Sequence, residues 1–109
     1  MEIKKNIRVG DRIRFVDFVC DMCEKDGKQY YALFDYAWRI AVITFFAPEA
    51  ELDKMGTDEM CDFVYSRQGI EIVEDPDIAV VTAGLYEACE AEMKDRKEKY
   101  MKVFDAINH

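Results

Sequence analysis

Residues 30–47 read YYALFDYAWRIAVITFFA, and this stretch decides the fold. It has only three clearly polar side chains, Asp35, Arg39 and Thr44. Read with a helical period, it is apolar nearly all round, which is typical of a helix that other elements pack around. Asp35 and Arg39 stand four residues apart in the order that favours a helical ion pair. The apolar positions of this predicted core helix are Leu33, Tyr36, Ala37, Ile40, Ile43 and Ala47, widened by Phe34, Trp38, Ala41 and Phe45.

Two other interpretations of this stretch are open to test. A membrane span needs about 20 apolar residues, and the short length and the charges of Asp35 and Arg39 argue against one. Residues 40–46 are rich in Val, Ile, Thr and Phe, which favour strands, so a buried strand is the alternative to helix there. Pro48 ends the element in either case, because the residue before a proline is pushed out of helical geometry.

The chain is short and acidic. Its 109 residues suffice for one domain with a single core, and half of them are apolar, so the composition is that of a folded protein. The first residues are not followed by the apolar region of a targeting signal, so we expect a protein of the host-cell cytoplasm. The net charge of −8 equals the excess within residues 49–77, which contain two bases and ten acids: Glu49, Glu51, Asp53, Asp58, Glu59, Asp62, Glu71, Glu74, Asp75 and Asp77.

Before the core helix, the sequence predicts a basic N-terminal arm over residues 1–10 and a helix over Asp11–Lys25. Asp11 suits the N-cap. The alternation in VGDRIRF leaves a strand over residues 11–16 as the alternative. Lys25–Lys28 is predicted to be a turn, because Asp-Gly suits positive backbone dihedrals, and a loop this short predicts an antiparallel helix pair. The expected buried face of the first helix consists of Ile13, Val16, Val19, Cys20 and Cys23.

After Pro48, the sequence predicts an acidic linker, a short helix over Asp58–Arg67 and a long C-terminal helix over Pro76–Ile107. Thr57 is the expected cap of the short helix, and Gly69 is expected to stop it. Residues 70–74 alternate and predict a short extended segment. Asp75-Pro76 is a strong helix start. Gly84 is expected to kink the long helix or to allow a close helix crossing. Together these elements predict an all-α domain of four helices, with residues 30–47 at its centre.

The cysteines form one C-x-x-C pair, Cys20 and Cys23, with Cys61 and Cys89 far along the chain. We interpret all four as small buried hydrophobic residues in a reducing compartment. A zinc site is the alternative, although four-thiolate sites usually need two such pairs. A redox pair is disfavoured because Cys20 and Cys23 fall near a helix end, where the dipole does not lower a thiol pKa.

The residues needed for catalysis are scarce. The only histidine is His109, at the frayed end of the chain, and the only serine is Ser66, which has no nucleophile elbow around it. No glycine-rich phosphate loop and no EF-hand pattern is present. We therefore expect no enzymatic activity, no cofactor and no metal.

The aromatic residues of the first half are expected in the core. Tyr30, Tyr31, Tyr36 and Trp38 are interpreted as core and core-edge residues, and Tyr65, Tyr86 and Tyr100 as surface residues suited to protein contacts.

The ten carboxylates of residues 49–77 are the candidate partner-binding site. Carboxylates imitate the spaced charges of a phosphate backbone, so an acidic protein can occupy the basic groove of a nucleic-acid-binding protein. A solvated surface that only maintains solubility is the plainer interpretation. We expect no direct binding to nucleic acid, because the basic patches are short and the overall field is repulsive. We also expect no membrane partner.

The segments RIRFVDFVCDMC and YYALFDYAWRIAVITFF resemble small uncharacterised helical proteins of Firmicutes phages and prophages. The resemblance covers about residues 11–50 and rests on Phe15-Val16, Cys23, Tyr31, Phe34, Ala37 and Arg39. It implies an origin in a phage or mobile element and one of two roles. The first is inhibition of a host defence system, such as a CRISPR effector. The second is virion assembly. Independently of the resemblance, the apolar stripe of the C-terminal helix fades through residues 94–99 and resumes at Tyr100, Val103, Phe104 and Ile107, so a homodimer would form through these four residues.

Overall fold

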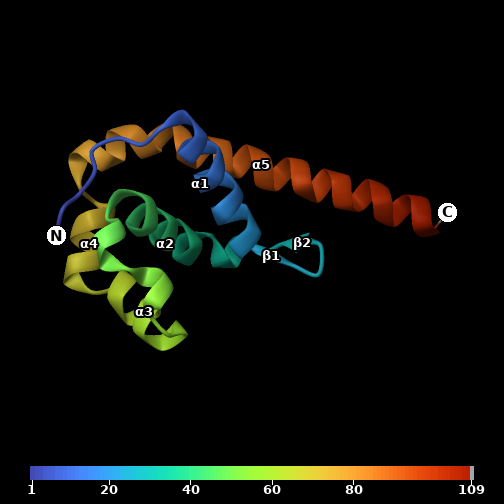
Figure 1. Ribbon diagram of the computed structural model, residues 1–109. Helices are drawn as coiled ribbons and strands as arrows, with labels where there is room; N and C mark the ends of the chain where they lie inside the picture. The colour runs from blue at the N-terminus through green and yellow to red at the C-terminus, as the bar shows by residue number, and fades with distance from the viewer. Residues whose placement is uncertain (109) are drawn as a thin grey trace.

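The computed structural model describes residues 1–108, so the expectation for His109 lies outside the described residues. Within them the chain is mostly helical, with one two-stranded hairpin, as Figure 1 shows. Three 3-10 turns, Tyr31–Leu33, Pro48–Ala50 and Leu52–Lys54, lie between the longer elements. In chain order these are α1 (Val9–Met22), β1 (Glu24–Lys25), β2 (Lys28–Gln29), α2 (Phe34–Phe46), α3 (Thr57–Val64), α4 (Arg67–Val73) and α5 (Pro76–Asn108).

The central apolar stretch forms α2, and the prediction of a core helix is confirmed. The alternative of a strand over residues 40–46 is wrong, because the helix places one continuous apolar surface against α1, α3 and α4. The helix begins at Phe34 rather than Tyr30, since a 3-10 turn precedes it and leaves Leu33 exposed. It ends before Pro48 as expected. Its buried residues are Ala37, Ile40, Ala41, Val42, Ile43 and Phe46.

The first helix, α1, begins two residues earlier than predicted, and Arg8 rather than Asp11 is its N-cap. Asp11 instead forms an ion pair with Arg14, in which a guanidinium nitrogen lies 2.8 Å from a carboxylate oxygen. The alternative of a strand over residues 11–16 is wrong. Ile13 is exposed, contrary to prediction, because it borders an open groove between α1 and α5 instead of the core.

The turn at residues 25–28 is confirmed, but it closes a β-hairpin and not a simple loop between two helices. Glu24 pairs with Gln29, and Lys25 pairs with Lys28. Asp26 and Gly27 occupy the two central positions with φ of 53° and 79°, which is the backbone that a two-residue hairpin requires. The helix α1 therefore ends at Met22 and not at Lys25.

The segment after Pro48 is more ordered than its composition suggested. The predicted linker contains two 3-10 turns, and each turn buries one side chain, Ala50 in the first and Leu52 in the second. The short helix α3 has Gly56 as its N-cap and not Thr57.

The predicted stop at Gly69 and the extended segment at 70–74 are wrong, because residues 67–73 form a further helix, α4. Ser66 caps it by accepting a hydrogen bond from the backbone N–H of Gly69 at 3.2 Å. Gly69 lies inside α4, where a Cβ atom would stand 2.3 Å from the carbonyl oxygen of Phe63. Glycine is therefore present to let α4 approach the end of α3, and not to end a helix.

The long helix α5 begins at Pro76, and the predicted cap is confirmed. One carboxylate oxygen of Asp75 accepts the backbone N–H groups of Asp77 and Ile78 at 2.9 and 3.1 Å. These backbone hydrogen bonds, opposed in part by burial, lower the pKa of Asp75. A Cβ atom at Gly84 would meet nothing within 4 Å, so the expected close helix crossing there is wrong.

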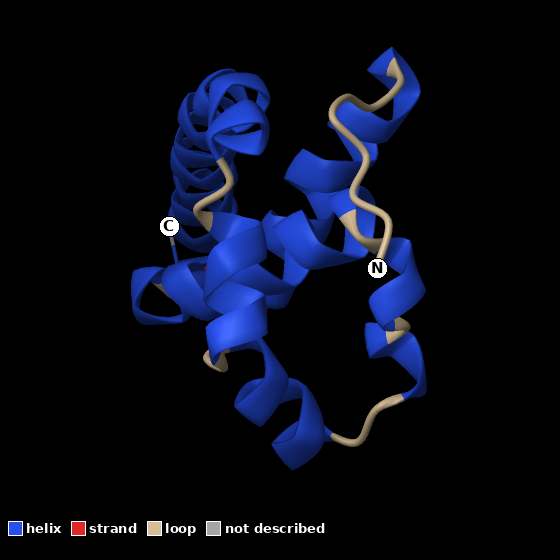
Figure 2. Ribbon diagram, turned by 90° about the vertical axis from the view of Figure 1, so that its left-hand side faces the viewer, coloured by secondary structure: helices blue, strands red, loops and turns tan. Residues whose placement is uncertain are grey.

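Beyond Met93, its last buried residue, α5 leaves the body and gives the molecule its long axis of 54 Å. Figure 2 views this helix nearly along its axis, beside the other helices. No helix within residues 1–108 is both long enough and apolar enough to cross a membrane.

The N-terminal segment, residues 1–7, runs from the α4 side across the body to α1 (Figure 1). Its backbone is tied to α2 by a hydrogen bond of 2.7 Å from the N–H of Lys4 to the carbonyl oxygen of Phe46. Ile3 and Ile7 pack against the core. The predicted basic arm is therefore an ordered strap.

Aromatic side chains join α1, α2 and α5. Trp38 lies with its ring centroid 5.2 Å from Phe15, 5.1 Å from Tyr86 and 6.1 Å from Phe34. Edge-to-face and stacked arrangements at such distances are favourable. Tyr36 and Trp38 are at the core edge as predicted, whereas Tyr30 and Tyr31 are exposed, contrary to prediction.

The two helical glycines provide a matched test of this packing. We expect Gly69→Ala to lower the free energy of unfolding by about 1–3 kcal/mol, because the added methyl group overlaps backbone atoms of α3. Gly84→Ala is the control, with open space around it and an expected gain of about 0.5–1 kcal/mol. Denaturant unfolding measures both. Equal stabilisation by the two substitutions would contradict the contact between α3 and α4.

Candidate protein-binding surfaces

The ten predicted carboxylates separate into two groups along the chain. Those of residues 71–77 belong to α4 and the start of α5, and those of residues 49–62 belong to the two 3-10 turns and α3. Asp75 is half-buried and the other nine are exposed. The structure therefore places all ten at or near the surface, but not in equivalent electrostatic surroundings.

The carboxylates of residues 71–77 are partly neutralised by bases. Lys5 of the N-terminal strap lies 3.3 Å from a carboxylate oxygen of Asp75 and 3.2 Å from one of Asp77. Glu71 pairs with Arg67 at 3.1 Å. Glu74 has no ion-pair partner among the described residues. Two bases therefore compensate half of the charge of these four carboxylates.

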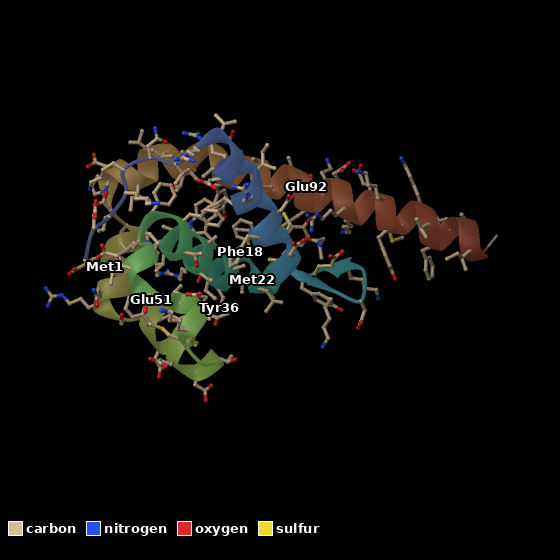
Figure 3. All side chains as sticks on the ribbon, in the orientation of Figure 1. Met1, Phe18, Met22, Tyr36, Glu51 and Glu92 are labelled. Atoms are coloured by element: carbon tan, nitrogen blue, oxygen red, sulfur yellow. The ribbon has the colours of Figure 1, made fainter. Side chains whose placement is uncertain are left out.

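Two carboxylates next to the core helix also have partners. The Glu49 carboxylate accepts the backbone N–H of Glu2 at 3.0 Å, and Glu51 pairs with Lys54 at 3.2 Å. Glu51 lies between the two 3-10 turns with a φ of 53°. Figure 3 shows this residue on the side of the molecule formed by α3 and α4. These two acids help to position the chain between α2 and α3.

The remaining carboxylates form what we call the α3 acidic surface, which consists of Asp53, Asp58, Glu59 and Asp62. All four are exposed, and none makes an ion pair within residues 1–108. Asp58 and Asp62 are one helical turn apart, and Glu59 is three residues before Asp62, so the three share one side of α3. Asp58 and Glu59 also interact favourably with the N-terminal dipole of α3, which has no side-chain cap. Among the carboxylates of residues 49–77, Glu49 and Glu74 also lack an ion-pair partner within residues 1–108, but these four are the ones grouped on and just before α3.

A cluster missed by the sequence analysis holds Tyr65 at the end of α3. Its hydroxyl donates to Asp35 at 3.0 Å, and the Arg39 guanidinium lies 5.0 Å from its ring centroid. The ring also stacks on Tyr36 at 6.4 Å. Burial and the hydrogen bond to Asp35 raise the pKa of Tyr65. Asp35 and Arg39 pair as predicted, at 3.1 Å. Nothing in their spacing indicated the third member, thirty positions away.

Tyr65 remains 45% exposed despite these contacts. It follows Asp58 and Asp62 at a spacing of seven and three residues, so the three side chains lie along one side of the helix. An aromatic side chain therefore extends the α3 acidic surface. Its ring is held in place before any partner binds.

Three of the four cysteines are buried, and Cys61 is exposed, contrary to prediction. Cys20 donates a weak hydrogen bond to the carbonyl oxygen of Cys89 at 3.7 Å. Burial raises the pKa of Cys20 to about 11 and that of Cys89 to about 12, and it also raises the pKa of Cys23. Within residues 1–108, no three cysteine, histidine or acidic side chains are grouped to hold a metal ion.

The predicted oligomer interface lies on the C-terminal arm, which we define as residues 94–107 of α5. Tyr100 is half-buried and stands against Gly27 of the hairpin, where an added Cβ would approach the ring to 2.9 Å. Val103 is 59% exposed, Ile107 is 78% exposed and Phe104 is 49% exposed. The apolar stripe of α5 thus continues beyond the body, and the hairpin covers only its first part.

Arg96 anchors the N-terminal end of the C-terminal arm to α1. Its guanidinium donates to Asp21 at 2.8 Å, to Asp17 at 3.3 Å and to Glu92 at 3.0 Å, which joins α5 to α1. Residues 94–99, with the sequence KDRKEK, are therefore not wholly solvated, because Arg96 turns toward the body.

A groove on the arm was not anticipated. Its volume is ≈ 550 Å³, and it is lined by Tyr31, Lys94, Lys97, Glu98, Met101 and Lys102. We call it the lysine groove. None of its three lysines makes an ion pair within residues 1–108. Lys94, Lys97 and Met101 recur on one side of the helix at a spacing that the sequence shows, but Tyr31, which completes the groove, is predicted in the core.

The thiols give a direct test of burial. We expect Ellman's reagent at about pH 8 to react rapidly with one thiol of the native protein, Cys61, because the thiolate fractions of Cys20 and Cys89 are about 10⁻³ and 10⁻⁴ at that pH. All four thiols should react in guanidinium chloride. Cys61→Ser is the control and should remove the rapid phase. A rapid phase of two or more thiols would contradict the packing of α1 on α5.

Comparison with known proteins gives no indication of function, so the function has to be inferred from these surfaces. No protein-family model matches the chain, and neither a curated protein nor a solved structure matches it.

Proposed function

We propose that this protein is a non-catalytic protein-binding module of phage or mobile-element type. In this proposal its α3 acidic surface occupies the basic groove of a nucleic-acid-binding host defence protein, in the manner of an anti-CRISPR protein. The inhibitor acts as a nucleic-acid mimic, and it blocks its target by competing with the natural ligand. The protein itself needs no cofactor for this function.

The observation that supports the proposal is the uncompensated charge of Asp53, Asp58, Glu59 and Asp62. Duplex DNA carries one negative charge per about 1.7 Å of axis, and proteins bind it chiefly by neutralising that charge with Lys and Arg. Carboxylates on a rigid helix offer the same partner a comparable density of negative charge. Because the body of the protein already holds α3 in place, little conformational entropy is lost when it binds.

The partition of the acidic residues narrows the proposed site. Lys5 and Arg67 compensate half of the charge at residues 71–77, so these carboxylates contribute less to a long-range field. The carboxylates of residues 49–77 therefore contribute unequally to partner binding, and those of the α3 acidic surface should contribute most. Tyr65 supplies an aromatic contact beside the charges, a residue type that often contributes strongly to binding energy.

Capture of a partner tests this proposal. We expect the immobilised protein to retain a basic nucleic-acid-binding protein from a nuclease-treated bacterial lysate. The captured protein should be released as salt rises toward about 1 M, because the Debye length there is only about 3 Å. Added duplex DNA should also release it by competition. The variant Asp58→Lys, Glu59→Lys, Asp62→Lys should capture at least tenfold less of this protein than the wild type does.

The control carries the same kind of charge change elsewhere. Glu87→Lys with Glu90→Lys alters two exposed acids of α5 that lie outside the α3 acidic surface, and it should capture the partner as the wild type does. Equal loss in both variants would indicate a response to net charge alone. Capture that survives both the triple reversal and DNA competition would contradict nucleic-acid mimicry.

A second candidate function is supported by the C-terminal arm. An apolar stripe that leaves the body on a projecting helix is suited to pairing with another helix. In this alternative the protein is a phage assembly or structural accessory protein, and the arm forms a homodimer. The exposed fractions of Val103 and Ile107, 59% and 78%, favour it.

The two candidates respond differently to mutation. We expect Val103→Asp with Ile107→Asp to abolish a concentration-dependent dimer in sedimentation velocity if the arm assembles, without unfolding the body, because both side chains are exposed. The triple reversal on α3 should leave such a dimer unchanged. A dimer that persists in the arm variant would refute assembly through this stripe.

A further inference from the structure

We infer that the lysine groove binds the α3 acidic surface of a second copy of this chain, so that molecules associate head to tail. The inference rests on the same acidic surface as the proposed function, and it adds a specific occupant for the groove. The two surfaces lie on different parts of the molecule, α3 on the body and the groove on the projecting end of α5 (Figure 1). One molecule therefore presents both surfaces at once.

Charge complementarity is the first support. The groove offers three lysines against one acid, Glu98, and none of the three is paired within the described residues. It is a positive site on a chain whose net charge is −8. The α3 acidic surface offers four carboxylates that are likewise unpaired within residues 1–108. Both surfaces are thus left with charge that the other can compensate.

The apolar groups of the two surfaces also correspond. Between its lysines the groove presents Tyr31 and Met101, which are 51% and 46% exposed. Beside its carboxylates α3 presents Tyr65, which the cluster around Asp35 and Arg39 holds in one position. Placing the Tyr65 ring against Met101 and Tyr31 would surround an aromatic contact with ion pairs. That arrangement of an anchor within a polar rim is common at protein interfaces.

The lengths of the two surfaces match. Lys94 and Lys102 are eight residues apart on α5, which is about 12 Å at 1.5 Å per residue. Asp58 and Tyr65 are seven residues apart, which is about 10 Å by the same rise. The segment from Asp58 to Tyr65 is therefore close in length to the segment of α5 that carries the lysines.

The symmetry of this contact has a measurable consequence. Because the two surfaces are different, the contact is heterologous, and it leaves one groove and one acidic surface free in every dimer. Association therefore continues to larger species as concentration rises. An interface of two helical turns is small, so we expect rapid exchange and strong sensitivity to salt.

Sedimentation velocity of the full chain tests the inference. At about 50 mM NaCl we expect the weight-average sedimentation coefficient to rise continuously with concentration, and the association constant to fall at least tenfold at about 300 mM NaCl. The groove variant Lys94→Gln, Lys97→Gln and the acidic variant Asp58→Asn, Asp62→Asn should each self-associate at least tenfold more weakly.

The decisive measurement is the mixture of these two variants. The intact acidic surface of the groove variant meets the intact groove of the acidic variant, so the mixture should form a one-to-one complex that does not grow further. Glu87→Gln with Glu90→Gln is the control for loss of charge and should associate as the wild type does. Val103→Ser with Ile107→Ser removes only the apolar stripe, without adding charge beside the lysines, and should also leave head-to-tail association intact.

Several results would overturn the inference. They are a wild type that stays monomeric at low salt, a mixture that forms no complex, and association lost in the Val103/Ile107 variant but retained in both charge variants. The last result would instead indicate the homodimer through the arm. The groove variant retains the α3 acidic surface, so capture of a basic partner by that variant would show that the proposed function stands even where self-association fails.

Discussion

The burial of α2 is the constraint on which the rest of the structure depends. Six of its side chains are buried, and α1, α3 and α4 each contact it. Burying a large apolar side chain contributes roughly 1.5–3 kcal/mol, so a helix that is apolar nearly all round folds only with a layer around it. The strap of residues 1–7 and the turns that bury Ala50 and Leu52 complete that layer. The ordered position of α3, and with it the acidic surface, follows from this enclosure.

Several features governed by local chemistry were predictable from the sequence, although the caps expected at Asp11 and Thr57 were wrong, and features governed by distant packing were not predictable. The core helix, its end before Pro48, the Asp26-Gly27 turn and the Asp75 cap follow from periodicity and turn preferences. The helix α4 was missed because Gly69 resembles a stop signal, whereas its purpose is the close contact with Phe63. The ten carboxylates were evident, but the ion pairs of Lys5 that divide them depend on the path of the strap. The lysine groove could not be predicted, because Tyr31 forms part of its lining and the position of Tyr31 depends on the fold.

The distribution of charge is more informative than its sum. The strap places a lysine beside the start of α5, and Arg96 directs three carboxylates toward the junction of α1 and α5. These two bases offset part of the charge of five carboxylates, whereas the carboxylates of the α3 acidic surface and the lysines of the lysine groove have no ion-pair partner within residues 1–108. A chain with net charge −8 thereby acquires two surfaces of opposite sign. Each surface also carries exposed aromatic or sulfur-containing side chains, so contact there would bury apolar area together with charge.

The position of Trp38 has an optical consequence. It is the only tryptophan of the chain, and its ring contacts Phe15 of α1 and Tyr86 of α5 as well as Phe34 of its own helix. Its emission is therefore governed by a site where three helices meet, while α3 and the arm lie elsewhere. Intrinsic fluorescence can follow the integrity of this junction without a dye, and binding events at either charged surface can be measured separately from unfolding of the core.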